Sequence, residues 1–149
     1  MQLVGCAPAL GAEAADRRCS NGSDMAAATF VKVRTSEGVV VCERCEIPET
    51  AFERARGLLG RDGLERGGGM LIDRTGSVHM FFMRFPIDVV FLDRDRKVVG
   101  IRSRLAPWRV AGARRAVAAL ELPAGAVAAA GVEEGDALVF EDLGSAHEH

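Results

Sequence analysis

Three side chains able to bind or transform a ligand fall within ten residues of one another: the imidazole of His79, the guanidinium of Arg84 and the carboxylate of Asp88. A guanidinium binds carboxylate and phosphate groups through paired hydrogen bonds, and an imidazole changes its charge near neutral pH. The three residues together predict a site for an anionic or polar ligand. The alternative is structural, because a carboxylate in apolar surroundings must accept hydrogen bonds, and Asp88 would then hold its turn in place.

Two further charged residues, Arg61 and Glu121, are candidates for the same site. Glu121 has apolar neighbours on both sides, which predicts a buried carboxylate whose partner is an arginine such as Arg61 or Arg84. One interpretation is an ion pair that fixes the register of the fold. The other is that Glu121 and Asp88 form a carboxylate pair for general acid–base chemistry. An acid–base or hydrolytic enzyme that uses His79 with Asp88 or Glu121 is therefore an alternative function.

Cys42 and Cys45 form a single C-x-x-C motif, with no second copy in the chain. A metal site would need further ligands, which would have to come from His79 or from the tail histidines His147 and His149. Redox motifs of this kind usually open a helix after a strand, whereas here the motif continues a strand. Residues three apart on a regular strand face opposite sides, so a disulfide would require a bend or bulge. We therefore expect ordinary packing of the two thiols, and no metal or other cofactor.

A basic stretch extends from Arg96 to Ala119, with seven basic residues, no acidic residue and Trp108 in its middle. Clustered arginines of residues 96–115 are typical of phosphate contacts, which makes a nucleic-acid-associated module a second alternative. The structural interpretation is a solvated loop in which the arginine stems cover Trp108. The net charge of −2 gives no general attraction to nucleic acid or to membranes.

Short apolar and β-branched segments predict strands, and one longer pattern predicts a helix. The helix covers residues 50–59, where Thr50 and Glu53 form a capping box and Gly60 ends the apolar face. A second, shorter helical turn is expected at 124–130, ended by Gly131. The predicted strands are 30–34, 39–42, 70–72, 78–84, 87–92, 97–103, 116–122 and 137–141. This pattern favours a strand-rich α+β fold, a curled or barrel-like and mostly antiparallel sheet capped by one short helix.

The 149 residues suit one domain, which we place at residues 29–143. Residues 1–28 show no sustained period and are expected to be a disordered leader, and residues 144–149 a frayed tail. No apolar run is long enough to span a bilayer. A cytoplasmic location is expected, with a lipid-anchored or exported form only if the true start lies upstream, because Cys6 ends a short lipoprotein-like sequence.

Five blocks of the sequence occur in the order and spacing of a known family. They are residues 54–61 (RARGLLGR), 69–71 (GML), 79–93 (HMFFMRFPIDVVFLD), 120–125 (LELPAG) and 131–136 (GVEEGD). Over residues 47–140 the chain resembles Domain of Unknown Function 192. Phe82 and Phe85 stand where the usual pattern of that family has a tryptophan and an asparagine. The resemblance implies a compact β-rich fold with little helix, and no established activity, cofactor or partner.

The residues thus lead to a preferred function and two alternatives. We expect a small non-enzymatic binding or accessory domain with a site for an anionic or polar ligand near His79, Arg84 and Asp88. The alternatives are the acid–base enzyme and the nucleic-acid module described above. A concave site that gathers these side chains would favour one of the first two functions.

Overall fold

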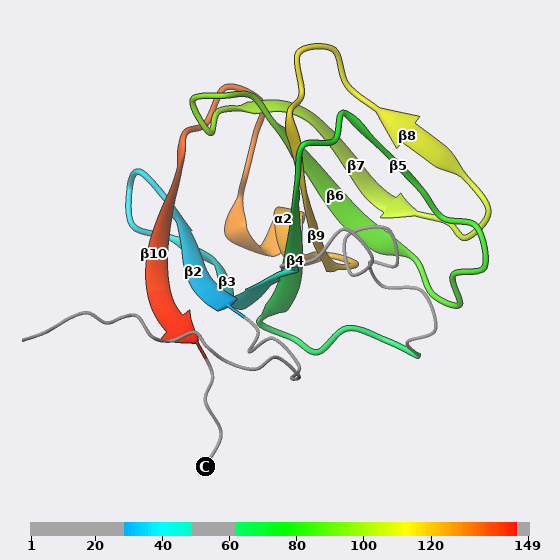
Figure 1. Ribbon diagram of the computed structural model, residues 1–149, viewed down its shortest axis with the longest axis horizontal. Helices are drawn as coiled ribbons and strands as arrows, with labels where there is room; N and C mark the ends of the chain where they lie inside the picture. The colour runs from blue at the N-terminus through cyan, green and yellow to red at the C-terminus, as the bar shows by residue number, and fades with distance from the viewer. Residues whose placement is uncertain (1–28, 49–61, 146–149) are drawn as a thin grey trace, which may run out of the picture.

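The computed structural model describes residues 29–48 and 62–145, which contain strands and one short helix (Figure 1). In chain order the elements are β2 (Thr29–Thr35), β3 (Val40–Ile47), β4 (Gly68–Asp73), β5 (Ser77–His79), β6 (Ile87–Leu92), β7 (Val98–Leu105), β8 (Val110–Gly112), β9 (Ala118–Pro123), α2 (Ala126–Ala130) and β10 (Leu138–Ser145). The strand-rich α+β class is confirmed. The helix predicted at 50–59 lies outside the described residues, and no helix within them is long and apolar enough to cross a lipid bilayer.

The large sheet has seven strands in the order β10-β2-β3-β4-β9-β6-β7. Its neighbouring strands are antiparallel except for the parallel pair of β3 and β4. The two outer strands approach each other at one end, where Lys97 and Ala137 form an isolated bridge just before β7 and β10. The sheet is therefore curled, as expected, but it is not closed into a barrel.

Both faces of this sheet are buried, as the alternation along β6 shows. Val90 and Leu92 pack into one hydrophobic core, and Ile87, Val89 and Phe91 pack into the other. Every residue of β6 is buried, which is why its sequence is an almost unbroken apolar run rather than an alternating one. The first core is covered by α2, which packs against β3, β6 and β9. The second is covered by the small sheet of β5 and β8, drawn at the right of Figure 1.

The short helix α2 confirms the helical turn predicted at 124–130. Val127 is its buried residue and packs into the first core. The helix ends at Gly131, whose φ of 71° is left-handed and whose N–H donates to the carbonyls of Val127 and Ala128. Glycine adopts this conformation without the steric cost that a Cβ brings, so the sequence signal for the helix end had a physical basis.

The strand predicted over residues 78–84 is wrong beyond His79. The chain turns there, because the N–H of Met83 donates to the carbonyl of Met80 at 3.2 Å. Met80 and Met83 both point into the second core, while Phe81 and Phe82 point outward. The apolar run was interpreted as a strand because all four residues have apolar side chains, but two of them belong to the surface. The partner strand β8, which was not predicted, pairs with β5 and supplies Ala111 to the second core.

Candidate functional site

Asp88 is fully buried in β6, and its carboxylate accepts hydrogen bonds from backbone N–H groups. One oxygen, Oδ1, accepts the N–H of Arg104 at 2.8 Å. The other, Oδ2, accepts the N–H groups of Gly125 at 3.1 Å and Val127 at 3.0 Å. These bonds connect β6 to the end of β7 and to the start of α2, as the structural interpretation of this residue expected. Both oxygens are occupied by backbone donors, so Asp88 holds β6, β7 and α2 together and does not face solvent.

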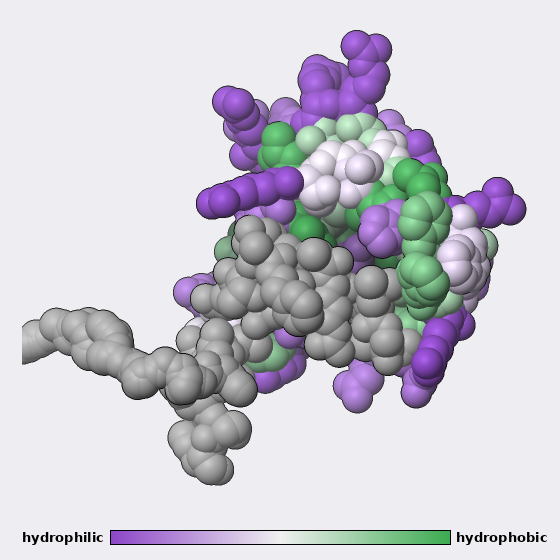
Figure 2. All heavy atoms as spheres, turned by 45° about the vertical axis from the view of Figure 1, so that its right-hand side comes forward, coloured by the Kyte–Doolittle hydropathy of each residue, from purple (hydrophilic) through white to green (hydrophobic). Residues whose placement is uncertain are grey.

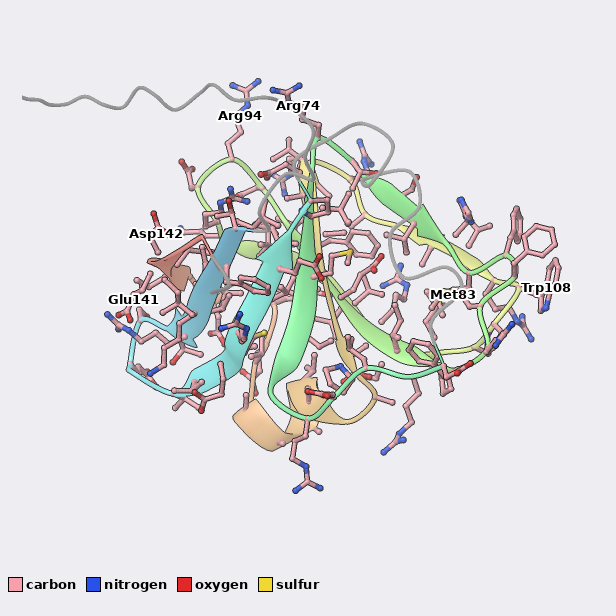
Figure 3. All side chains as sticks on the ribbon, turned by 60° about the horizontal axis from the view of Figure 1, so that its bottom comes forward. Arg74, Met83, Arg94, Trp108, Glu141 and Asp142 are labelled. Carbon is pink, nitrogen blue, oxygen red and sulfur yellow. The ribbon has the colours of Figure 1, made fainter. Side chains whose placement is uncertain are left out.

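His79, in contrast, lies exposed at the end of β5 and belongs to an aromatic group. Its ring stacks on Phe81 with 5.0 Å between the centroids. Phe81 lies 6.0 Å from Trp108, and Phe82 meets Trp108 edge to face at 4.8 Å. We call His79, Phe81, Phe82 and Trp108 the aromatic surface. Figure 3 places Trp108 at the outer end of the β5–β8 sheet, pointing away from the core.

The aromatic surface is built from two loops that hydrogen bonds join. The N–H of Met80 donates to the carbonyl of Arg109, and the N–H of Trp108 donates to the carbonyl of Met80, both at 2.7 Å. Met80 itself is buried, so it anchors the pair of loops to the second core. The rings above it are exposed, Phe82 to 71% and Trp108 to 59%. Figure 2 shows hydrophobic atoms on this side of the molecule with hydrophilic side chains around them.

Two residues of this surface have an unfavourable backbone conformation. Phe82 has a φ of 65° and Trp108 a φ of 70°. The left-handed region is costly for bulky L-residues, and residues held in it concentrate at binding and catalytic sites. Both residues present exposed rings, so the strain holds apolar side chains in water. From the sequence, Trp108 was expected either in a phosphate-binding patch or beneath arginine stems, and Phe82 was expected on a strand.

Arg84 follows Phe82 by two residues, in the same loop. Its Nη1 lies 2.6 Å from Oδ1 of Asp62, and both side chains are mostly exposed, at 64% and 85%. An exposed ion pair of this kind contributes little to stability, because water screens the charges and the two side chains lose freedom. The guanidinium of Arg84 is therefore available to another anion at small cost.

Glu121 lies elsewhere, in β9 between β4 and β6, opposite Met70 and Val89. It is nearly buried, as the apolar neighbours in the sequence predicted. Its paired neighbours Met70 and Val89 belong to the second core, so its side chain faces that core. Glu121 is buried there, whereas the rings of the aromatic surface are exposed. Of the two partners proposed for it, Arg84 pairs with Asp62, and Arg61 lies outside the described residues.

Cys42 and Cys45 are both fully buried in the first core, on one side of β3. The expectation of opposite faces is wrong, because β3 contains a bulge. Cys42 pairs with Val33 and Cys45 with Val31, so between these pairs one residue of β2 faces two of β3. Both thiols are free. Within the described part of the chain no three His, Cys, Asp or Glu side chains gather as a metal site would require.

The basic residues of the stretch 96–115 are spread over β7 and the segments on either side of it. Strand β7 separates Lys97 from Arg104 by roughly 20 Å at the usual rise per residue. Arg96 pairs with Asp73 at 3.3 Å. Arg102 donates to the carbonyls of Ile101 and Gly112. A hollow of about 830 Å³ between β7 and the loop after β8 is lined by Lys97, Arg102, Arg114 and Arg115, together with Asp93 and Glu134.

Comparison with known proteins gives a family and several relatives. The family model described as "Uncharacterized ACR" matches residues 31–140. A UPF0127 protein of Thermococcus sibiricus is 32% identical over 117 residues, which cover 73% of each chain. A UPF0127 protein of Pyrococcus furiosus is 44% identical over 70 residues, which cover 46% of this chain and 60% of the relative.

Two crystal structures share the fold. A protein of Sinorhizobium meliloti 1021, described as a "putative transcription regulator", has a TM-score of 0.68 at 27% identity, covering 80% of this chain and 98% of its own. A protein of unknown function from Novosphingobium aromaticivorans has a TM-score of 0.65 at 26% identity, covering 87% of this chain and 99% of its own.

Proposed function

Because the chain belongs to the family DUF192, which carries no assigned activity, we propose its function from its own side chains: a non-enzymatic binding module for a planar, anionic ligand. The aromatic surface stacks on the planar group, and Arg84 binds the anion. The observation that carries the proposal is the contact of Phe82 with Trp108, two exposed rings that both have left-handed backbones. The proposed site contains His79 and Arg84, as expected from the sequence. Asp88 is not part of it and stabilises the fold instead.

The energetics favour a binding role for these rings. A left-handed backbone costs on the order of 1–3 kcal/mol for each non-glycine residue. Exposing large rings forgoes the further stabilisation that their burial would give. The core below gains nothing from either feature, since Met80 and Met83 supply its side chains at this point. Rigid, exposed aromatic side chains are a common means of binding flat ligands and partners.

The ion pair of Arg84 with Asp62 supports the anionic part of the proposal. A ligand carboxylate or phosphate would replace the Asp62 carboxylate, and it would accept two hydrogen bonds from the guanidinium instead of the single 2.6 Å contact. His79 stacks on Phe81 at the edge of the same surface, where its ring nitrogens add polar contacts.

The acid–base alternative has weaker support. It pairs His79 with Asp88 or Glu121, and His79 is on the small sheet whereas both carboxylates are on strands of the large sheet. Asp88 has both oxygens bonded to backbone N–H groups. Asp88 would have to give up these bonds to exchange a proton, which makes the acid–base enzyme the weaker proposal.

The proposal is tested with the single tryptophan of the chain, Trp108, whose fluorescence reports on the aromatic surface alone. Adenosine monophosphate, adenosine and inorganic phosphate are the probes, because they separate the planar group from the anion. We expect adenosine monophosphate to bind most tightly, with Arg84→Met removing its advantage over adenosine. Equal titration curves in the native protein, Phe82→Ala and Arg84→Met would contradict the proposal.

A short single-stranded oligonucleotide is added because stacked bases and bound phosphates are also the elements of single-strand recognition. The description of the Sinorhizobium meliloti protein is a second reason to include it. An oligonucleotide affinity that greatly exceeds that of adenosine monophosphate and falls steeply with salt would favour the nucleic-acid alternative.

A further inference from the structure

The bulge in β3 brings the two cysteines of the C-x-x-C motif to one side of the strand. The carbonyl of Gly67 accepts the N–H groups of both Glu43, at 2.9 Å, and Arg44, at 3.0 Å. One residue of β2, Lys32, lies opposite these two residues of β3, and this defines the bulge. Glu43 and Arg44 point to solvent, and the cysteines on either side of them point inward.

The two thiols lie in the same core, on the same side of the bulged strand. Contact with the Cys45 thiol holds the pKa of Cys42 below its usual range. Contact with Cys42, followed by burial, raises the pKa of Cys45. The pair is therefore asymmetric, with the negative charge favoured on the Cys42 sulfur and the proton on Cys45. A lowered pKa favours the nucleophilic thiolate form of Cys42.

A segment of three glycines lies between the Cys42 sulfur and a surface hollow. The hollow, of about 470 Å³, is lined by Glu43, Arg44 and the three glycines 67–69, among others. The sulfur lies 3.5 Å from the carbonyl oxygen of Gly67. It is also 2.9 Å from the position that a Cβ on Gly69 would occupy. Cys42 has no exposed surface of its own, so the proposed reagent would reach it through this glycine segment.

We propose that Cys42 and Cys45 form a redox-active pair that reduces hydroperoxides. The Cys42 thiolate attacks the terminal peroxide oxygen, the O–O bond breaks, and the departing oxygen takes a proton to leave as an alcohol or water. Cys42 is then a sulfenic acid. The sulfur of Cys45 attacks it, the S–S bond forms, and the S–O bond breaks to release water. Two thiols and one hydroperoxide thus give one disulfide, one alcohol and one water.

An external dithiol closes the cycle by thiol–disulfide exchange. It reduces the Cys42–Cys45 disulfide to two thiols and is itself oxidised to a disulfide. The site lies on β3 and does not include the aromatic surface, so the proposal stands independently of the binding function. The competing explanation is that both cysteines are inert core residues, since free cysteine is among the most buried residue types.

The first experiment looks for the disulfide directly. In a chain carrying Cys6→Ser and Cys19→Ser, only the two cysteines of the motif remain. The folded protein is treated with hydrogen peroxide, its remaining thiols are alkylated in denaturant, and it is digested with trypsin. Arg44 lies between the two cysteines, so trypsin separates them onto peptides 35–44 and 45–54. We expect the two peptides joined after peroxide and separate after dithiothreitol.

The second experiment tests the order of the steps with two isosteric variants in the same background. Cys45→Ser removes the resolving thiol, so the sulfenic acid should accumulate on Cys42 and be trapped by dimedone. Cys42→Ser should give no adduct under the same conditions. The proposal is overturned if the joined peptide forms only in urea-unfolded protein, if it does not form at all, or if both variants give equal adducts.

Discussion

The carboxylate of Asp88 accepts the backbone N–H of Val127 at 3.0 Å, and this bond attaches the first turn of α2 to a buried strand. The same side chain accepts two more N–H groups, from Arg104 and Gly125. Asp88→Asn keeps one oxygen and places an NH₂ group against at least one buried N–H donor. We expect the free energy of unfolding, measured by urea denaturation, to fall by about 2–4 kcal/mol.

The matched control for this prediction is His79→Ala, since His79 is the exposed member of the original trio. Its free energy of unfolding should stay within about 0.5 kcal/mol of the native value. An Asp88→Asn variant with native stability and impaired binding of adenosine monophosphate would instead return Asp88 to the binding site.

The sequence predicts that Asp88 needs hydrogen-bond donors, but it does not predict which residues supply them. A carboxylate within an apolar strand must find donors, and that much could be predicted. Its donors come from residues 16, 37 and 39 positions further along the chain. Only the pairing of β6 with β7 and β9 brings these residues together, and a local pattern contains no information on that pairing.

Phe82 offers a test of backbone strain, because its φ of 65° suits glycine better than a side chain. Phe82→Gly and Phe82→Ala both remove the ring, but only glycine relieves the left-handed conformation. We expect the glycine variant to be more stable than the alanine variant by about 1 kcal/mol in thermal or urea unfolding. Both should lose binding at the aromatic surface.

Phe81 is the control residue, since it is exposed on the same loop and is not among the residues with positive φ. There the order should reverse, with Phe81→Ala more stable than Phe81→Gly, because glycine loses more backbone freedom on folding. Equal effects at the two positions would mean that Phe82 carries no strain.

The loop of Phe82 also explains why the aromatic surface could not be predicted. Met80 to Met83 is an apolar run, and such a run at a strand end is normally buried. The run is divided here between core and solvent, with the methionines inside and the phenylalanines outside. The division depends on the turn at Met80 and on hydrogen bonds to Arg109 and Trp108, which the sequence does not reveal.

Gly69 is packed tightly between Cys42 and the backbone of β9. A Cβ there would lie 2.9 Å from both the Cys42 sulfur and the carbonyl oxygen of Glu121. We expect Gly69→Ala to lower the free energy of unfolding by about 1–3 kcal/mol through overpacking. Gly63→Ala, where a Cβ has open space, is the control.

The same contact gives a double-variant test. Cys42→Ala removes the sulfur from the contact but leaves the Glu121 carbonyl, which belongs to the backbone. Gly69→Ala should therefore cost less in the Cys42→Ala background than in the native chain, without becoming neutral. An unchanged cost would show that the sulfur does not limit the space at Gly69.

Asp93 gives the fold a dependence on acid. Its Oδ1 accepts the N–H groups of Lys97 and Asp95, which hold the turn between β6 and β7. These bonds hold the pKa of Asp93 below its usual value. A lowered pKa in the folded state stabilises the fold above the pKa of the unfolded chain, and this contribution disappears as the pH falls through both values.

The neutral variant Asp93→Asn isolates that contribution from the other carboxylates. The native protein should have the higher melting temperature near pH 7, and the difference should shrink below about pH 4. A difference that stays constant with pH would mean that the charge of Asp93 is not what stabilises the turn.

Asp62 pairs with Arg84 and therefore competes with the proposed ligand for the same guanidinium. Asp62→Asn removes the competing charge and should tighten the binding of adenosine monophosphate by roughly two- to fivefold, in line with the small energy of exposed ion pairs. The binding of adenosine, which has no anion, should not change. In the background of Arg84→Met the Asp62→Asn effect should vanish, since no guanidinium remains to be released. A gain that persists without Arg84 would point to a general reduction of negative charge at this surface, and it would remove Arg84 from the proposed site.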